Sequence, residues 1–210
     1  MIIRNELKSD YREVEELTRR AFWNLNVPGC IEHYLVHVMR NHEDFVSPLD
    51  FVMEHDGRII ANIMFVKSKL IDEAGNKKTV LTFGPLSVLP EYQRKGYGKE
   101  LLEYSFQKAV ELGYDAVVIF GNPENYVSRG FKNCKKYCIS IGNDVFPTPL
   151  LVKELCARAI PERNWIFQES SAYQIDHGAV EEYDKTFETL IKKYQPSQEL
   201  FDIYSHSRVF

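Results

Sequence analysis

Apolar residues at the start of the chain follow first a strand-like and then a helical spacing. Residues 2–3 indicate a short strand, and Val14, Leu17 and Ala21 recur at helical intervals after Ser9. The Ser9 hydroxyl is expected to cap that helix.

A second helix is predicted over about residues 31–41, and an antiparallel meander follows it. Residues 51–55 and 58–70 have the composition of strands, and Asp56-Gly57 between them is a two-residue turn typical of β-hairpins. A longer turn leads into a third strand that ends near Val88.

The middle of the chain has the pattern of a βαβ unit. The strand ending near Val88 is followed by a glycine-containing stretch, residues 93–98, and then by a helix that Gly113 ends. The residues expected on the inner face of this helix are Leu101, Leu102, Ser105, Phe106, Ala109 and Leu112. Residues 115–120 are a nearly unbroken apolar run, typical of a strand covered on both faces. Because a helix connects the two strands, we expect them to be parallel.

The last third of the chain is predicted to contain both helix and strand. Thr148-Pro149 is typical of a helix start, which predicts a short helix through Ala159. A last strand is expected over residues 165–173, and an amphipathic helix from Val180 to Tyr194, closed by Pro196. The element pattern favours one mixed α/β domain with a helical extension.

Composition and charge are those of an ordinary globular protein. Hydrophobic residues make up 44% and charged residues 27%, which excludes wholesale disorder and fibrous architectures. The 26 Lys+Arg against 30 Asp+Glu give a charge of -4, so nucleic acid is not expected as the main partner. The N-terminus soon becomes polar and acidic, and no apolar run approaches the roughly 20 residues that span a bilayer. We therefore expect no membrane partner and a cytoplasmic location.

Neither metal binding nor a nucleophilic hydrolase is favoured by the reactive side chains. His33 and His37 have a spacing that can ligate zinc, but Tyr34 stands where a HExxH motif needs Glu, and no third ligand is evident. No GxSxG motif occurs. The cysteines, which show no paired CxxC spacing and are expected to be reduced thiols, are Cys30, Cys134, Cys138 and Cys156.

Gly96-Tyr-Gly98 stands where a strand passes into a helix. The first amides of a helix have no internal acceptor, and glycine lets a ligand approach them closely. Arg94, Lys95 and Lys99 add positive charge, so the stretch is a candidate phosphate cradle. A P-loop is not favoured, because the upstream glycine and the hydroxyl residue are missing, and Leu101 stands where a dinucleotide fingerprint needs a third glycine. A basic surface turn with capping glycines is the alternative.

The stretch Gln93-Arg-Lys-Gly-Tyr-Gly98 resembles the [Q/R]-x-x-G-x-[G/A] pyrophosphate loop of the GNAT superfamily of N-acetyltransferases. Residues 84–92 before it and 99–102 after it are similar to that superfamily's motif A. The resemblance extends over roughly residues 1–175, and residues 83–174 are most similar to YhbS-type predicted N-acetyltransferases.

The resemblance implies the GNAT fold, a mixed α/β (α+β) architecture. Its central sheet is mostly antiparallel, contains a parallel, splayed strand pair and is flanked by helices. Gly84-Pro85 independently predicts that strand pairing fails locally, because proline cannot donate to a ladder and glycine tolerates a bulge. Residues 1–175 would form the transferase domain. Residues 176–210 would be a helical extension, packed on or swapped from the same domain, that either covers the acceptor cleft or pairs two subunits into a homodimer.

The resemblance also implies the site residues. The pyrophosphate of coenzyme A would be held by Arg94, Lys95, Gly96, Tyr97, Gly98 and Lys99. The pantetheine arm would contact the strand end at Leu86, Ser87 and Val88. Residues 122–131 resemble the family's Y-x-x-x-G-F segment, which makes Tyr126 the candidate general acid at the thioester sulfur and Asn122 a cofactor contact.

The activity implied is transfer of an acetyl group from acetyl-CoA to a primary amine, by direct attack in a ternary complex. Keeping an amine of pKa near 10.4 neutral at pH 7 costs about 4–5 kcal/mol, and the leaving thiolate gains from a proton donor. An ordinary tyrosine is a weaker acid than a thiol, so a hydrogen bond to the developing thiolate is then the main effect. Glu54, Glu91, Glu124 or a bound water could be the base, but no motif selects one.

The acceptor, a small molecule or a peptide, cannot be named from these patterns. Two other functions stay open. One is a non-catalytic acyl-CoA-binding or regulatory module on the same fold, and the other is nucleotide binding at the glycine loop.

Overall fold

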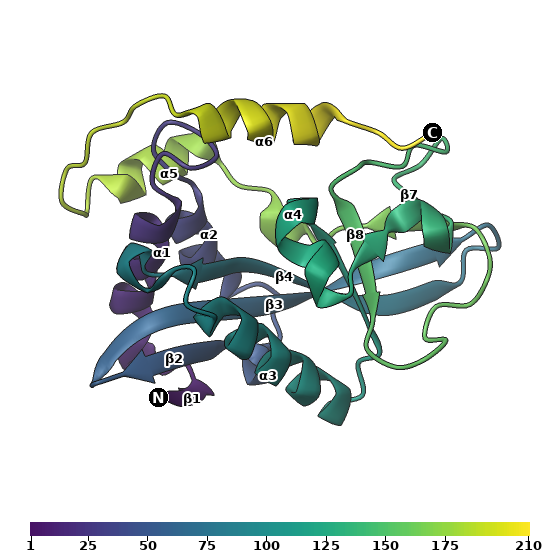
Figure 1. Cartoon of the computed structure of the whole chain (residues 1–210), viewed down its shortest axis with the longest axis horizontal. Helices are drawn as coiled ribbons and strands as arrows, with labels where there is room; N and C mark the ends of the chain where they lie inside the picture. The colour runs from purple at the N-terminus through teal and green to yellow at the C-terminus, as the bar shows by residue number, and fades with distance from the viewer. The chain divides into compact units, whose positions relative to one another are not determined.

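The computed structural model describes all 210 residues. The strands are β1 (Ile2–Asn5), β2 (Phe51–His55), β3 (Arg58–Asp72), β4 (Lys77–Val88), β5 (Ala116–Phe120), β6 (Lys132–Asn133), β7 (Ile139–Ser140), β8 (Leu150–Glu154) and β9 (Trp165–Gln168). The helices are α1 (Tyr11–Phe22), α2 (Glu32–Met39), α3 (Tyr97–Glu111), α4 (Pro123–Tyr126), α5 (His177–Asp184) and α6 (Pro196–His206) (Figure 1).

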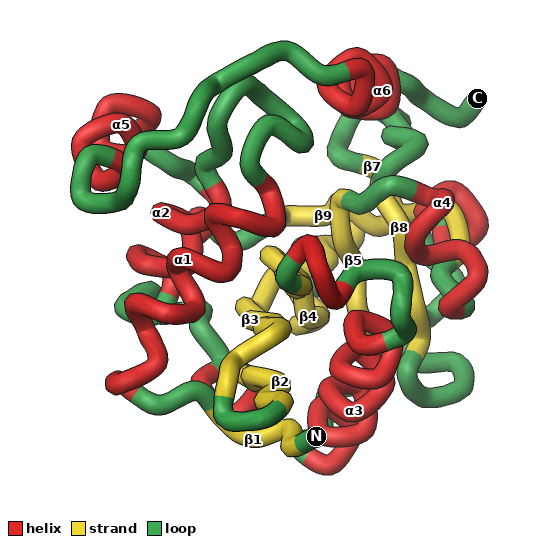
Figure 2. Tube along the Cα trace, turned by 60° about the vertical axis from the view of Figure 1, so that its left-hand side comes forward, coloured by secondary structure: helices red, strands yellow, loops and turns green.

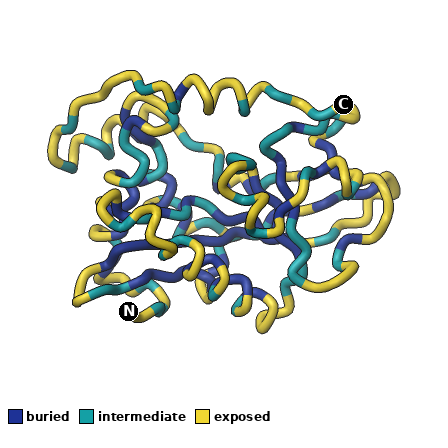
Figure 3. The backbone as a smooth tube through the Cα atoms, viewed as in Figure 1, coloured by how far each residue is buried: buried dark blue, intermediate teal, exposed yellow.

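All nine strands belong to one mixed sheet, whose main order is β1-β2-β3-β4-β5-β8-β6, with β9 paired to β3 and β7. The pairs β1–β2, β2–β3 and β5–β8 are antiparallel, whereas β4 and β5 are parallel, with Leu81 opposite Val117. Buried residues are concentrated along the strands, and the hairpin turns are exposed (Figure 3). This confirms the mixed α/β fold with its parallel strand pair.

The chain forms two compact units, and β3, β4 and α3 contribute residues to both. Unit 1 comprises residues 1–65, 83–108 and 171–198. Unit 2 comprises residues 66–82, 109–170 and 199–210.

Helices α1 and α2 of unit 1 pack against each other. Val14 and Leu17 of α1 and Met39 of α2 are buried, which confirms the helical spacing seen in the sequence. The capping prediction was wrong, because α1 begins at Tyr11 after a short 3-10 turn, two residues beyond Ser9.

The hairpin between β2 and β3 forms at the predicted turn. Asp56 and Gly57 both have positive φ angles, 50° and 76°, as a type I′ turn requires. Figure 2 shows β1, β2 and β3 lying side by side in unit 1. The strand pattern of this region is therefore confirmed.

The inner face of α3 is also largely as predicted. The buried members are Leu101, Leu102, Ser105, Phe106 and Ala109. Leu112 is 48% exposed, because the helix ends one residue earlier, at Glu111.

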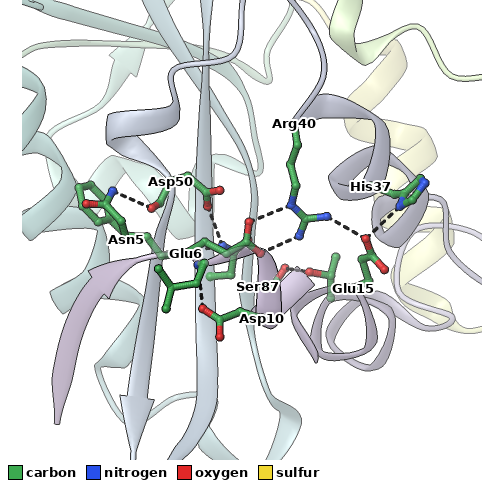
Figure 4. Close-up of polar contacts among 12 residues, drawn as sticks. Asn5, Glu6, Asp10, Glu15, His37, Arg40, Asp50 and Ser87 are labelled. Atoms are coloured by element: carbon green, nitrogen blue, oxygen red, sulfur yellow. Dashed lines mark hydrogen bonds and ion pairs between the residues drawn. The ribbon is translucent and has the colours of Figure 1, made fainter. Parts of the chain in front are cut away.

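A buried polar cluster in unit 1 is centred on Arg40, which lies between two carboxylates (Figure 4). Its guanidinium donates to Glu6 over 2.6 and 2.8 Å and to Glu15 over 2.8 Å. Asp50 is also buried and accepts a hydrogen bond from the side chain of Asn62 over 3.2 Å. Burial and the neighbouring Glu6 raise the pKa of Asp50 to about 9. Asp50 is therefore protonated at neutral pH and hydrogen-bonded to Glu6.

Helix α5 is fixed to α1 in unit 1 by polar contacts. Asp184 accepts from the Arg19 guanidinium over 2.7 Å, and the Tyr183 hydroxyl donates to Glu15 over 2.6 Å. Beyond α5 the chain is irregular, held where Trp23 donates to the carbonyl of Ile191 over 3.1 Å. The expected helix from Val180 to Tyr194 is thus only partly right: α5 ends at Asp184, and Ile191 and Tyr194 are 83% and 65% exposed.

The expectation that Pro196 closes this helix was wrong, because Pro196 opens α6. Proline fits the first helical position, where its missing N–H would have no partner.

Unit 2 has its own apolar core around β5. Its buried members are Leu70, Val80, Ala116, Val118, Cys134, Ile139, Leu150, Val152, Ile160, Trp165 and Phe167. The apolar run that predicts β5 is therefore buried, except at its last residue, Phe120, which is 44% exposed.

The predicted helix from Thr148 to Ala159 was wrong, because Leu150–Glu154 form strand β8. This strand pairs with β5 on one side and β6 on the other, and its first three residues are at most 2% exposed. Pairing on both edges outweighs the local capping signal of Thr148-Pro149. The last predicted strand is also shorter, since β9 ends at Gln168 and a 3-10 turn follows.

No helix in the structure combines the length and the hydropathy of a transmembrane span.

Candidate active site

The glycine stretch forms an exposed loop at the start of α3 in unit 1. Arg94 and Gly96 have positive φ angles, 61° and 94°, so the backbone turns sharply before the helix begins at Tyr97. The Gln93 side chain donates to the carbonyl of Val88 over 3.0 Å, which ties the loop to the end of β4. A Cβ at Gly98 would lie 3.4 Å from the Val88 side chain, in ordinary van der Waals contact, so the helix starts close to the end of β4.

This loop has the properties of an anion site. The amides of Tyr97, Gly98 and Lys99 lie in the first turn of α3, where no intrahelical acceptor exists. Arg94 is exposed and forms no ion pair, and Lys99 contacts only Glu103, at 3.7 Å on the helix surface. Free amides and exposed cations at a helix start suit a diphosphate.

The last residues of β4 divide between two faces. Ser87 is buried, and its hydroxyl lies 2.9 Å from that of Thr18 on α1. Leu86 and Val88 are half-buried and point to the opposite face. The side chain of Ser87 is thus used inside unit 1, which leaves only its backbone for a ligand.

The Gly84-Pro85 pair interrupts the regular course of β4. Gly84 has a φ angle of +152°, which disfavours any residue with a Cβ. Its carbonyl accepts from the Tyr173 hydroxyl over 3.4 Å, so a side chain contacts this backbone group. Strand β4 itself continues past this point to Val88.

Tyr126 lies in unit 2, in a short helical turn that follows β5. Its ring packs edge-to-face on Phe131, with ring centroids 5.6 Å apart. A Cβ at Gly121 would come within 2.7 Å of the ring, so only glycine lets the tyrosine lie here. Burial raises the pKa of Tyr126 to about 12.

Asn122 caps the same turn. Its side-chain oxygen accepts from the amide of Glu124 over 2.9 Å, and Pro123 occupies the first helical position. The side-chain NH2 of Asn122 is left to donate. The structure thus places Asn122 and Tyr126 in one turn of unit 2, and the loop and β4 residues together in unit 1.

The carboxylates considered from the sequence are paired with cations or exposed to solvent. Glu91 contacts Arg20 and Arg58, and a hydrogen bond from its own backbone together with these two cations lowers its pKa. Glu54 is paired with Arg4 over 3.2 Å. Glu124 is exposed.

The two histidines of α2 have structural partners. His33 is fully buried, with Nδ1 3.2 Å from the Cys30 sulfur and Nε2 3.3 Å from Asp184. His37 contacts Glu15 and Tyr183, both at 3.0 Å. No group of three or more side chains in the structure has the arrangement of a metal site.

The comparisons with known proteins identify the family of the chain. Residues 13–132, more than half of the chain, match the model of the Acetyltransferase (GNAT) family. The chain belongs to this family. The matched range contains the exposed loop, Asn122 and Tyr126, and it confirms the resemblance seen in the sequence.

Relatives of this GNAT chain include two Escherichia coli proteins named as uncharacterized N-acetyltransferases. YhbS is 31% identical over 133 residues, 63% of this chain and 74% of YhbS. YjhQ is 25% identical over 147 residues, 70% of this chain and 75% of YjhQ.

Two solved structures share the fold, each with 22% identity. The E. coli YhbS structure in complex with CoA has a TM-score of 0.69 and covers 83% of this chain and 92% of its own. A GNAT acetyltransferase from Brucella melitensis in complex with acetyl-CoA has a TM-score of 0.65 and covers 82% and 97%.

Proposed function

We propose that this GNAT chain transfers the acetyl group of acetyl-CoA to a primary amine by direct attack within a ternary complex. The observation that carries the proposal is the exposed loop from Gln93 to Lys99, which combines free helix-start amides with exposed cations. Family membership and the CoA and acetyl-CoA complexes of two proteins with this fold support the same conclusion.

The loop would hold the pyrophosphate of acetyl-CoA through the amides of residues 96–99 and the side chains of Arg94 and Lys95. The backbone of Leu86, Ser87 and Val88 would bind the pantetheine arm, since the Ser87 hydroxyl is already used by Thr18. Together these contacts would fix where the thioester lies.

Tyr126 would act on the leaving sulfur as a hydrogen-bond donor. With its pKa at about 12, moving its proton to a thiolate of ordinary pKa near 8.5 would cost about 5 kcal/mol. A hydrogen bond needs no such transfer and stabilises the charge that develops as the C–S bond breaks. The side-chain NH2 of Asn122 is a second donor in the same turn.

The test compares two glycines of unit 1 that both have a positive φ angle. Gly96 and Gly57 have φ angles of +94° and +76°, and a Cβ added to either residue would meet no atom within 4 Å. Gly96→Ala and Gly57→Ala should therefore cost similar stability, about 1–2 kcal/mol. We expect only Gly96→Ala to weaken CoA binding, by tenfold or more in calorimetry.

Turnover is measured as thiol release from acetyl-CoA over a panel of primary amines. An acetyltransferase releases CoA with at least one amine, and its rate falls in Gly96→Ala. A non-catalytic acyl-CoA-binding module would bind CoA without releasing thiol. Equal CoA affinity for wild type and Gly96→Ala would contradict the assignment of the loop.

A further inference from the structure

A primary amine must lose a proton before it attacks, and neither the loop nor Tyr126 can accept one at neutral pH. The group required is a carboxylate whose pKa lies close to 7, since an acceptor works best near the operating pH. It also has to be free of ion pairs, because a bound cation lowers the pKa of a carboxylate.

Most carboxylates of unit 2 are engaged or fully solvated. Asp72 accepts from Arg163 over 2.7 Å, and Asp115 accepts from Lys78 at similar distances. Glu154 accepts from the amide of Ile160 over 3.0 Å. These residues are anchored by their donors, and carboxylates such as Glu162 are exposed to solvent.

Glu169 differs from all of these. It is half-buried, and no group of the chain hydrogen-bonds or ion-pairs with its carboxylate. Burial alone raises its pKa to about 7. Lys67 and Lys69, the cations of the neighbouring strand β3, are not paired with it, and Lys69 lies opposite Gln168 on the exposed face.

Glu169 directly follows β9, which ends at Gln168 and contacts the end of β5. Leu70 of β3 lies opposite Phe167 of β9, and both residues are buried. The Phe167 ring contacts that of Phe120, the last residue of β5, with centroids 6.0 Å apart. Phe120 directly precedes Gly121, against which Tyr126 packs.

The backbone next to Glu169 is fixed within the sheet. The Ser170 amide donates to the Ser68 hydroxyl over 3.1 Å, and Thr82 of β4 donates to the same hydroxyl over 2.8 Å. The Thr82 hydroxyl also lies 2.9 Å from the carbonyl of Val118 on β5. Glu169 is therefore held beside the parallel pair of strands, at whose carboxyl ends ligands bind in α/β sheets.

We propose that Glu169 is the general base of the transferase, taking the proton of the acceptor's ammonium group at the carboxyl end of β5. This rests on the proposed function. The ammonium loses one proton to the Glu169 carboxylate, and the neutral nitrogen forms a bond to the thioester carbon. The C–S bond breaks, and the second nitrogen proton goes to the leaving sulfur. Glu169 then returns its proton to solvent.

The test is the pH profile of kcat/KM for Glu169→Gln, with Glu169→Asp and Glu162→Gln as companions. Gln keeps the size of the side chain but cannot accept a proton. We expect about a hundredfold loss at pH 7 and no limb with an apparent pKa near 7. The remaining rate should instead rise about tenfold per pH unit toward the pKa of the amine.

The companions separate a chemical role from a structural one. Glu169→Asp should keep the limb near pH 7 at a reduced rate, and the exposed Glu162→Gln should match wild type. CoA affinity and melting temperature should be unchanged in Glu169→Gln, which shows that the fold and the loop are intact.

Two outcomes overturn the proposal and differ from each other. If wild type turns over and Glu169→Gln keeps its rate and pH profile, Glu169 is not the base, and the transferase assignment stands. If wild type binds CoA but acetylates no amine in the panel, the transferase assignment fails and the base fails with it.

Discussion

The buried carboxyl of Asp50 makes the stability of the chain depend on pH. Its pKa is about 9 in the folded protein against 3.8 for an ordinary aspartate, because burial and Glu6 disfavour its charged form. Between these values the folded state binds one proton more than the unfolded state. The contribution of Asp50 to the free energy of unfolding is therefore full at low pH. Between the two pKa values it falls by about 1.4 kcal/mol for each unit that the pH rises.

Asp50→Asn removes this proton without removing the contacts. The Asn side chain can accept from Asn62 through its oxygen and donate to Glu6 through its NH2, as protonated Asp50 does. From pH 5 to pH 8 wild type should lose about 4 kcal/mol through Asp50 alone, and the variant should lose none of it.

The assay is urea unfolding of wild type and Asp50→Asn at pH 5, 6.5 and 8. The difference between their free energies of unfolding should grow in favour of the variant by about 1.4 kcal/mol per pH unit. Asp56→Asn is the control, because it makes the same substitution at a side chain that is 90% exposed, directly after β2. A constant difference between wild type and Asp50→Asn would refute the reasoning.

Three further predictions concern residues of the site and its surroundings. Tyr126→Phe should lower kcat about tenfold or more and leave CoA affinity unchanged, measured by thiol release and calorimetry; an unchanged kcat removes Tyr126 from the mechanism. Gly121→Ala should lower kcat as Tyr126→Phe does, although the Tyr126 hydroxyl is still present, because the added Cβ would lie 2.7 Å from the Tyr126 ring and displace it. A normal kcat would show that the position of the ring is unimportant. Asn24→Gly should lower the free energy of unfolding by about 1–3 kcal/mol and speed proteolysis near residues 185–195. The reason is that the Asn24 side chain hydrogen-bonds to the backbone of Gly29, Ile191 and Lys193. An unaltered cleavage rate would contradict this anchoring role of Asn24.

The parts of the fold that the sequence predicts well are those encoded locally. Asp56-Gly57 is a turn because of its own backbone preferences, and the apolar run of β5 shows that both of its faces are covered. The loop at residues 93–98 is found because its glycines and cations are adjacent in the chain.

The parts that sequence reasoning misses depend on distant partners. Thr148-Pro149 has the local chemistry of a helix start, but pairing with β5 and β6 makes the following residues a strand. Proline at 196 can follow one helix or begin another, and the local pattern does not separate the two.

Single buried carboxylates are the hardest residues to find. Asp50 differs from other aspartates because the fold buries it against Glu6, a residue far away in the sequence. Glu169 carries no motif, and its pKa follows from burial that only the fold supplies.

The most direct test is an amide NMR titration of the full chain with CoA. The account predicts that the backbone amides of Gly96, Tyr97, Gly98 and Lys99 shift together and saturate at the affinity that calorimetry gives. If CoA binds while these four signals stay in place, the pyrophosphate is held elsewhere and the account is wrong.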